Sequence, residues 1–142
     1  MKNNKKAVFY IRIGHDDKNQ ERLIQEKKRK FNEFIKKNSI KNYDFYIDIG
    51  YPGTNFDRPE FQRMLRDIEN NKIDCVIYDK YTQICTNIYK YHKFIYDYLE
   101  QRKIKYISWD NLDKDSQMIN KLIYMKQKQI LKENNKKKDF IK

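Results

Sequence analysis

Two short segments of the chain carry arginine and glycine in patterns suited to holding a phosphate. Arg12 and Gly14 follow an apolar run near the start of the chain, and Arg58 ends a loop that contains Gly53. A planar guanidinium donates two parallel hydrogen bonds to phosphate oxygens, and glycine adopts backbone conformations that other residues avoid. These residue types favour a phosphate site at the two loops.

The stretch 50–65 closely resembles one part of a known family. It is a glycine-punctuated loop that ends in Asp57-Arg58-Pro59 and runs straight into an amphipathic helix. It resembles the loop after the second strand in the catalytic domain of serine site-specific recombinases, the resolvase/invertase family, and looks most like the large serine recombinase branch. The resemblance implies that Arg58 holds the scissile phosphate of DNA. Taken alone, the same three residues are also an ordinary helix-start signal.

The segment 10–17 matches the same family except at one position. Tyr10, Arg12 and Ile13 fit the pattern, but Gly14 stands where the resemblance places the nucleophilic serine. Attack on a phosphodiester needs an oxygen whose proton can leave, and glycine has no side chain. His15 and Thr54 are conceivable substitutes, although a displacement of about 1 Å can cost roughly 10²-fold in rate.

A third segment, 79–87, also departs from the family pattern. The resemblance implies two arginines here that stabilise charge on the phosphate, and Gln83 and Thr86 replace them. Cys85 replaces a glycine, while Asn87 matches the closing asparagine. Losing one preorganised donor typically costs about 10²–10³ in rate. We therefore expect the site residues Arg12, Gly14, Arg58, Gln83 and Thr86 to form an inactive version of a recombinase site, with Arg12 and Arg58 still able to bind phosphate.

Strand and helix patterns alternate along the chain and position these segments. Short apolar runs predict strands at 7–11, 43–49, 73–78 and 104–109, and apolar stripes at helical spacing predict helices at 21–37, 59–70, from 86 past 99, and 117–131. Asp57 and Thr86 are the expected N-caps of two helices, and 79–85 is expected to be a loop. The alternation predicts an α/β fold. The resemblance makes it a resolvase-like three-layer fold with a mainly parallel sheet of four to five strands and a C-terminal helix. In such a fold the functional crevice lies at the carboxyl ends of the strands, where these loops begin.

Composition and charge limit the partners. The chain has 142 residues and a net charge of +12, which favours a polyanion such as nucleic acid. We expect a catalytic-type domain over 1–116 and a basic C-terminal helix and tail over 117–142. No stretch approaches the roughly 20 apolar residues of a membrane span, and two cysteines without ligand spacing suggest a cytoplasmic protein with no metal or cofactor.

Three functions remain open at this stage. The favoured one is an inactive recombinase-family protein that makes weak contacts to the DNA backbone, as a homo-oligomer or as a heterodimer with an active recombinase. Base reading is not expected, because phosphate contacts position a protein without specifying sequence. The second is an active recombinase with a relocated nucleophile or one completed by a partner chain. The third is a basic α/β module for a phosphorylated ligand.

Overall fold

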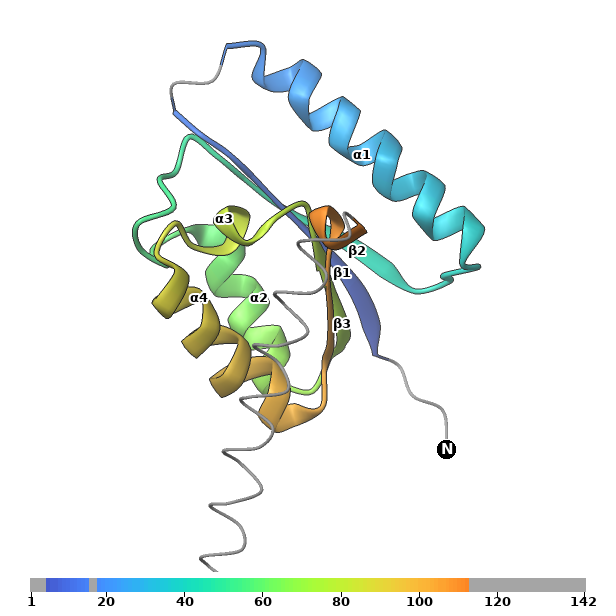
Figure 1. Cartoon of the computed structure of the whole chain (residues 1–142). Coiled ribbons are helices and arrows are strands. Elements are labelled where there is room, and N and C mark those ends of the chain that lie inside the picture. Colours follow the sequence, from blue (N-terminus) through green and yellow to red (C-terminus); the bar gives the residue numbers. More distant parts are fainter. Residues whose placement is uncertain (1–4, 16–17, 113–142) are drawn as a thin grey trace, which may run out of the picture. The chain divides into compact units, whose positions relative to one another are not determined.

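The computed structural model describes residues 5–15 and 18–112, and within them a parallel β-sheet forms the centre of the fold (Figure 1). The sheet has four strands in the order β2-β1-β3-β4, and every neighbouring pair is parallel. The strands are β1 (Lys6–Ile13), β2 (Tyr43–Ile49), β3 (Ile73–Tyr78) and β4 (Lys105–Ser108). The predicted α/β class and parallel sheet are confirmed.

Helices cover both faces of this sheet, so the fold has three layers (Figure 1). Helix α1 (Gln20–Lys37) packs on one face, and α2 (Pro59–Glu69) and α4 (Ile88–Phe94) pack on the other. Helix α4 continues through a π-helical turn (Ile95–Leu99) and a 3-10 turn (Glu100–Arg102). A short helix α3 (Tyr81–Ile84) follows β3, and a 3-10 turn (Trp109–Leu112) follows β4.

The central strand β1 explains why its sequence is apolar without alternation. Val8 and Tyr10 lie in the core beneath α2 and α4, while Phe9 and Ile11 lie in the core beneath α1, and all four are fully buried. A strand buried on both faces needs apolar side chains at successive positions. The aromatic rings of Phe9 and Phe31 meet at 5.2 Å between centroids and join β1 to α1.

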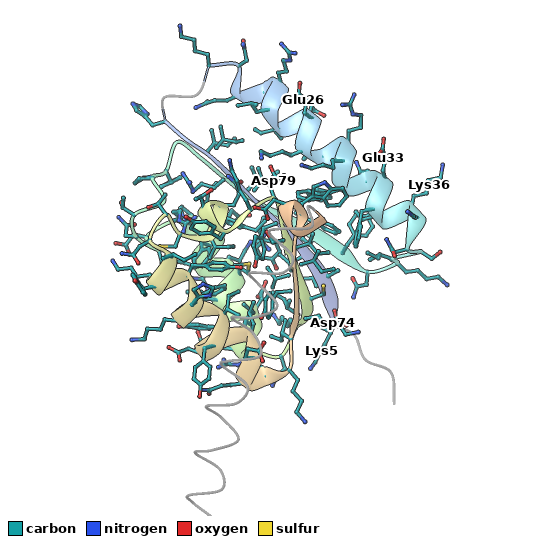
Figure 2. All side chains as sticks on the ribbon, viewed as in Figure 1. Lys5, Glu26, Glu33, Lys36, Asp74 and Asp79 are labelled. Carbon is teal, nitrogen blue, oxygen red and sulfur yellow. The ribbon has the colours of Figure 1, made fainter. Side chains whose placement is uncertain are left out.

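Helix α1 is held on the sheet by an apolar stripe and by an acidic residue at the end of β3. Its buried residues are Ile24, Phe31 and Ile35. Asp79 lies beneath the helix and accepts hydrogen bonds from Lys27 and Lys30, each at 2.7 Å (Figure 2). Burial alone would raise the pKa of Asp79, but the two lysines outweigh that effect and hold it below its usual value.

The order of the strands decides which loops meet. The chain leaves β1 for β2 on one side through α1, then crosses to β3 on the other side of β1 through α2. Right-handed crossovers in opposite directions place these two helices on opposite faces. The carboxyl ends of the strands therefore form a switch point between the loops after β1, β2 and β3, where ligands bind in open α/β sheets.

Both predicted helix caps are wrong. The side chain of Asp57 makes no cap on α2. Instead Asp48, at the end of β2, accepts hydrogen bonds from the backbone N–H groups of Glu60 (2.9 Å) and Phe61 (3.0 Å). The carboxylate reaches the helix from a neighbouring strand, which no local pattern reveals. Asn87, and not Thr86, is the N-cap of α4. Its side-chain oxygen accepts hydrogen bonds from two backbone N–H groups in the first turn of the helix.

The loop expected over 79–85 is also only partly a loop, because α3 lies within it. One compact unit runs to Trp109, and the residues from Asp110 onward belong to a second unit. The helix expected over 117–131 and the boundary expected at 116 lie outside the described residues. Among the residues that the structure describes, no helix has the length and apolar character needed to cross a bilayer.

Candidate functional site

Arg12, near the end of β1, is tied to the two neighbouring loops. Its guanidinium donates from Nη1 to the backbone oxygen of Tyr51 at 3.2 Å and from Nη2 to the backbone oxygen of Thr82 at 2.8 Å. One acceptor belongs to the loop after β2 and the other to α3. The Arg12 side chain therefore bridges the loops on both sides of β1.

Gly53 makes this bridge possible because it lies directly against the guanidinium. A Cβ at this position would lie 2.8 Å from Nη2 of Arg12 and 2.8 Å from Cγ2 of Thr86. The Gly53 carbonyl accepts the backbone N–H of Thr86 at 2.9 Å and its hydroxyl at 3.2 Å. A side chain at position 53 would force Arg12 or Thr86 to shift, and Thr86 is bound to the loop that contains this glycine.

Arg58 is completely buried, with an exposed fraction of 0%. It donates from Nη1 to the backbone oxygen of Gln83 at 3.0 Å, from Nη2 to that of Ile84, and from Nε to that of Asn55 at 3.2 Å. Its guanidinium carbon also lies 4.6 Å from the centre of the Phe61 ring. In this conformation Arg58 offers no exposed surface to a phosphate, and its predicted role in phosphate binding stays a prediction.

A buried tyrosine connects Arg58 to an acidic residue. Tyr10 accepts a hydrogen bond from Nη1 of Arg58 at 2.8 Å and donates to Asp48 at 2.7 Å. Burial raises the pKa of the Tyr10 hydroxyl well above its ordinary value, and Asp48 adds to the effect while Arg58 opposes it. Tyr10 therefore stays neutral, and its hydroxyl bridges the carboxylate and the guanidinium through two hydrogen bonds.

Gln83 is buried and faces β1. Its side-chain oxygen accepts the backbone N–H of Arg12 at 2.8 Å, and its own backbone oxygen accepts from Arg58. A neutral amide in this position carries no positive charge with which to stabilise a phosphate. Cys85, the other replacement in this segment, is fully buried in the core beneath α2 and α4.

The structure brings four of the five predicted site residues into one network. Arg12, Arg58 and Gln83 are joined by hydrogen bonds, and Thr86 meets Arg12 across Gly53. The fifth, Gly14, directly follows β1, and its backbone oxygen accepts from the Gln20 side chain at 3.3 Å. His15 and Thr54, the conceivable substitute nucleophiles, are both exposed.

Sequence reasoning missed two members of the network, Tyr10 as a site residue and Asp48 altogether. The only signal for Asp48 was a carboxylate inside an otherwise apolar strand end. A buried acid of this kind normally has partners. No group of three or more potential metal ligands occurs among the described residues.

The comparisons with known proteins identify the family. A family model described as the resolvase N-terminal domain matches residues 7–138. The chain belongs to this family. The resolvase family is the one that the sequence motifs predicted, so that prediction is confirmed. A search of curated protein sequences finds no match.

Solved structures of serine recombinases share the resolvase fold of this chain. The N-terminal catalytic domain of TP901-1 integrase is 19% identical, with 90% of this chain and 98% of that chain aligned and a TM-score of 0.64. A serine recombinase from Sulfolobus solfataricus is 18% identical over 85% of this chain and 79% of its own, with a TM-score of 0.62. The C-terminal catalytic domain of ISC1926 TnpA, an IS607-like serine recombinase, is 16% identical over 84% and 80%, also with a TM-score of 0.62.

Proposed function

We propose that this resolvase-family chain binds the DNA backbone and does not cut it. One observation carries the proposal. Arg12 and Arg58 donate their N–H groups to carbonyls of the chain itself, in a site where Gly14 provides no hydroxyl. Strand transfer needs an oxygen nucleophile and donors aimed at the phosphate, and this arrangement supplies neither.

Two further residues support the absence of cleavage. Gln83 presents its oxygen to the Arg12 backbone, and the Thr86 hydroxyl donates to the Gly53 carbonyl. Each is committed to an internal hydrogen bond at a position where the recombinase pattern has an arginine. A serine restored at position 14 would therefore face a site that still lacks two guanidinium groups.

Exposed lysines at the site end of the sheet support a role in binding. Lys18 lies between β1 and α1, Lys80 follows β3, and Lys90 lies in the first turn of α4; all three are exposed. Lysines on one edge can neutralise neighbouring phosphates, and the binding then depends on salt but not on sequence. The net charge of +12 favours the same partner.

A cleavage assay tests the inactive site. The wild type and Gly14→Ser are incubated with supercoiled plasmid and analysed in SDS gels for nicks and for covalent protein–DNA adducts, with an active serine recombinase on its own site as the positive control. We expect no adduct from either protein. An adduct from the wild type would overturn the proposal, and mass spectrometry of the attached residue would then distinguish His15 from Thr54.

A binding assay tests the DNA contact. Fluorescence anisotropy of a duplex of about 30 base pairs, measured over a range of salt concentrations, gives the slope of log K against log salt. The slope changes by about 0.9 for each phosphate contact on B-DNA. We expect the triple variant Lys18→Gln, Lys80→Gln, Lys90→Gln to lower the slope by about two to three units.

The matched control changes three lysines at the other end of the sheet. Lys36 and Lys37 lie in the last turn of α1, Lys41 precedes β2, and all three are exposed. Replacing them with glutamine alters the net charge equally, so a site-specific contact predicts a much smaller change in slope. Equal changes in the two triple variants would remove the proposed surface, and a wild type that fails to bind at low salt would remove the function.

A further inference from the structure

Strand β1 extends further than its neighbour β3 at the site end of the sheet. Strand β1 pairs with β3 as far as Tyr10 opposite Tyr78, where β3 ends, while β1 continues to Ile13. Beyond that point β3 provides no backbone acceptor for β1. The side-chain oxygen of Gln83 takes this place and accepts the Arg12 backbone N–H at 2.8 Å.

The same bond fixes α3 over the two arginines. Helix α3 contributes the backbone oxygens of Thr82 to Arg12 and of Gln83 and Ile84 to Arg58. A phosphate that reached these guanidinium groups would have to displace those oxygens first. Helix α3 has only four residues and no side-chain cap, so its placement depends on the burial of Ile84 in the core and on contacts with the rest of the site.

The residue type at position 83 decides whether such a bond can form. An arginine, which the recombinase pattern has at this position, carries only donors and cannot accept a backbone N–H. A glutamine has a carbonyl oxygen and the reach to do so. The replacement therefore removes a positive charge from the site and adds a new link between α3 and β1.

We propose that Gln83 is a latch that keeps α3 closed over Arg12 and Arg58 and so excludes phosphate from both. The latch controls access of phosphate to the two arginines. Its effect on DNA binding rests on the proposed function. Its own test uses the free protein and inorganic phosphate, so a failure of DNA binding and a failure of the latch give different results. With the latch closed, DNA meets the exposed lysines and not the two arginines.

Hydrogen exchange followed by NMR tests the latch. Gln83→Ala removes the acceptor, and we expect the backbone amide of Arg12 to exchange about tenfold faster, the effect of losing one hydrogen bond. The amide of Val8, in the middle of the same strand, reports global unfolding and is the reference, so the exchange of Arg12 should rise more than that of Val8. Gln83→Glu keeps an oxygen acceptor and should retain the protection of the Arg12 amide. If any substitution at position 83 destabilised the region, Gln83→Glu would lose this protection as well.

Titration with inorganic phosphate tests the closure. We expect a saturable shift of the Arg12 Nε–H signal in Gln83→Ala and none in the wild type or in Gln101→Ala, which changes an exposed glutamine. If Gln83→Ala does not fold, Gln83→Met keeps the length and packing of the side chain without a comparable acceptor. Unchanged exchange at Arg12, or faster exchange without a phosphate response, would overturn the latch.

Discussion

Nη1 of Arg58 donates to the hydroxyl of Tyr10 across 2.8 Å, at a depth where neither residue has any exposed surface. The two residues lie 48 positions apart in the chain. The contact converts an arginine at the end of a surface loop into part of the core. The contact gives this arginine a structural role that does not depend on the residue at position 14.

Arg58→Ala should destabilise the protein strongly. It leaves the carbonyls of Gln83 and Ile84 and the Tyr10–Asp48 pair buried without their donor, and breaking a buried charged network typically costs about 3–5 kcal/mol. Urea unfolding followed by circular dichroism measures the change. Arg66→Ala, on the exposed side of α2, is the matched control and should stay within about 0.5 kcal/mol of the wild type. Similar losses for the two variants would show that Arg58 has no special structural role.

Gly53→Ala should destabilise the site by overpacking. The added methyl group would meet Nη2 of Arg12 and the methyl group of Thr86 at 2.8 Å each, and forced overpacking typically costs about 1–3 kcal/mol. Thr86→Ser removes one of the two clashing groups, so the cost of Gly53→Ala should be smaller in that background. A double-mutant cycle from thermal unfolding checks this, and strict additivity would contradict the packing account.

His92 should make the stability depend on pH. Its Nε2 atom is buried and has no hydrogen-bond partner among the described residues, and burial lowers its pKa below the ordinary 6.5. The unfolded chain then binds a proton more readily than the folded one. Stability is therefore fully present above about pH 6.5 and falls as the pH drops through the lowered pKa. The melting temperature of His92→Phe should fall less between pH 7.5 and 5.5 than that of the wild type, whereas His15→Asn, at an exposed position, should match the wild type.

Asp79→Asn should loosen α1. The ionised carboxylate holds Lys27 and Lys30, and the lowered pKa of Asp79 means that this stability is present above its unfolded value of about 3.8 and is lost as the pH falls through the folded value. Each charge-assisted bond contributes roughly 1.5–3 kcal/mol at most. The variant should therefore lose less stability than the wild type between pH 5 and pH 3 in urea titrations. Asp57→Asn, at an exposed position, provides the comparison, and identical acid profiles for Asp79→Asn and wild type would contradict the prediction.

The strands and the long helices could be predicted from sequence because their apolar patterns are local. The expected range for β2 matches the observed Tyr43–Ile49, and that for β3 matches Ile73–Tyr78. Helix α3 was missed because four residues are too few to show a helical period. The cap of α2 was assigned to Asp57 because it is adjacent, whereas the observed acceptor, Asp48, comes from a strand.

The sequence motifs named residues that lie together in the fold, but the surroundings of these residues could not be predicted. The motifs named Arg12, Arg58 and Gln83, and these three are joined in the structure. The burial of Arg58 could not be predicted, since its acceptors are mainly backbone oxygens from residues 83 and 84 and any residue type can provide those. The position of a backbone carbonyl is fixed by the fold and cannot be read from the residue type.

The burial of Arg58 has a consequence for the order in which the chain folds. Until β1, the loop after β2 and α3 have all come together, the guanidinium remains hydrated, and moving it out of water before its acceptors arrive would cost several kcal/mol. A partly folded domain thus gains little stability from burying Arg58 before these three segments have met. Formation of these contacts should accordingly coincide with the final cooperative folding transition.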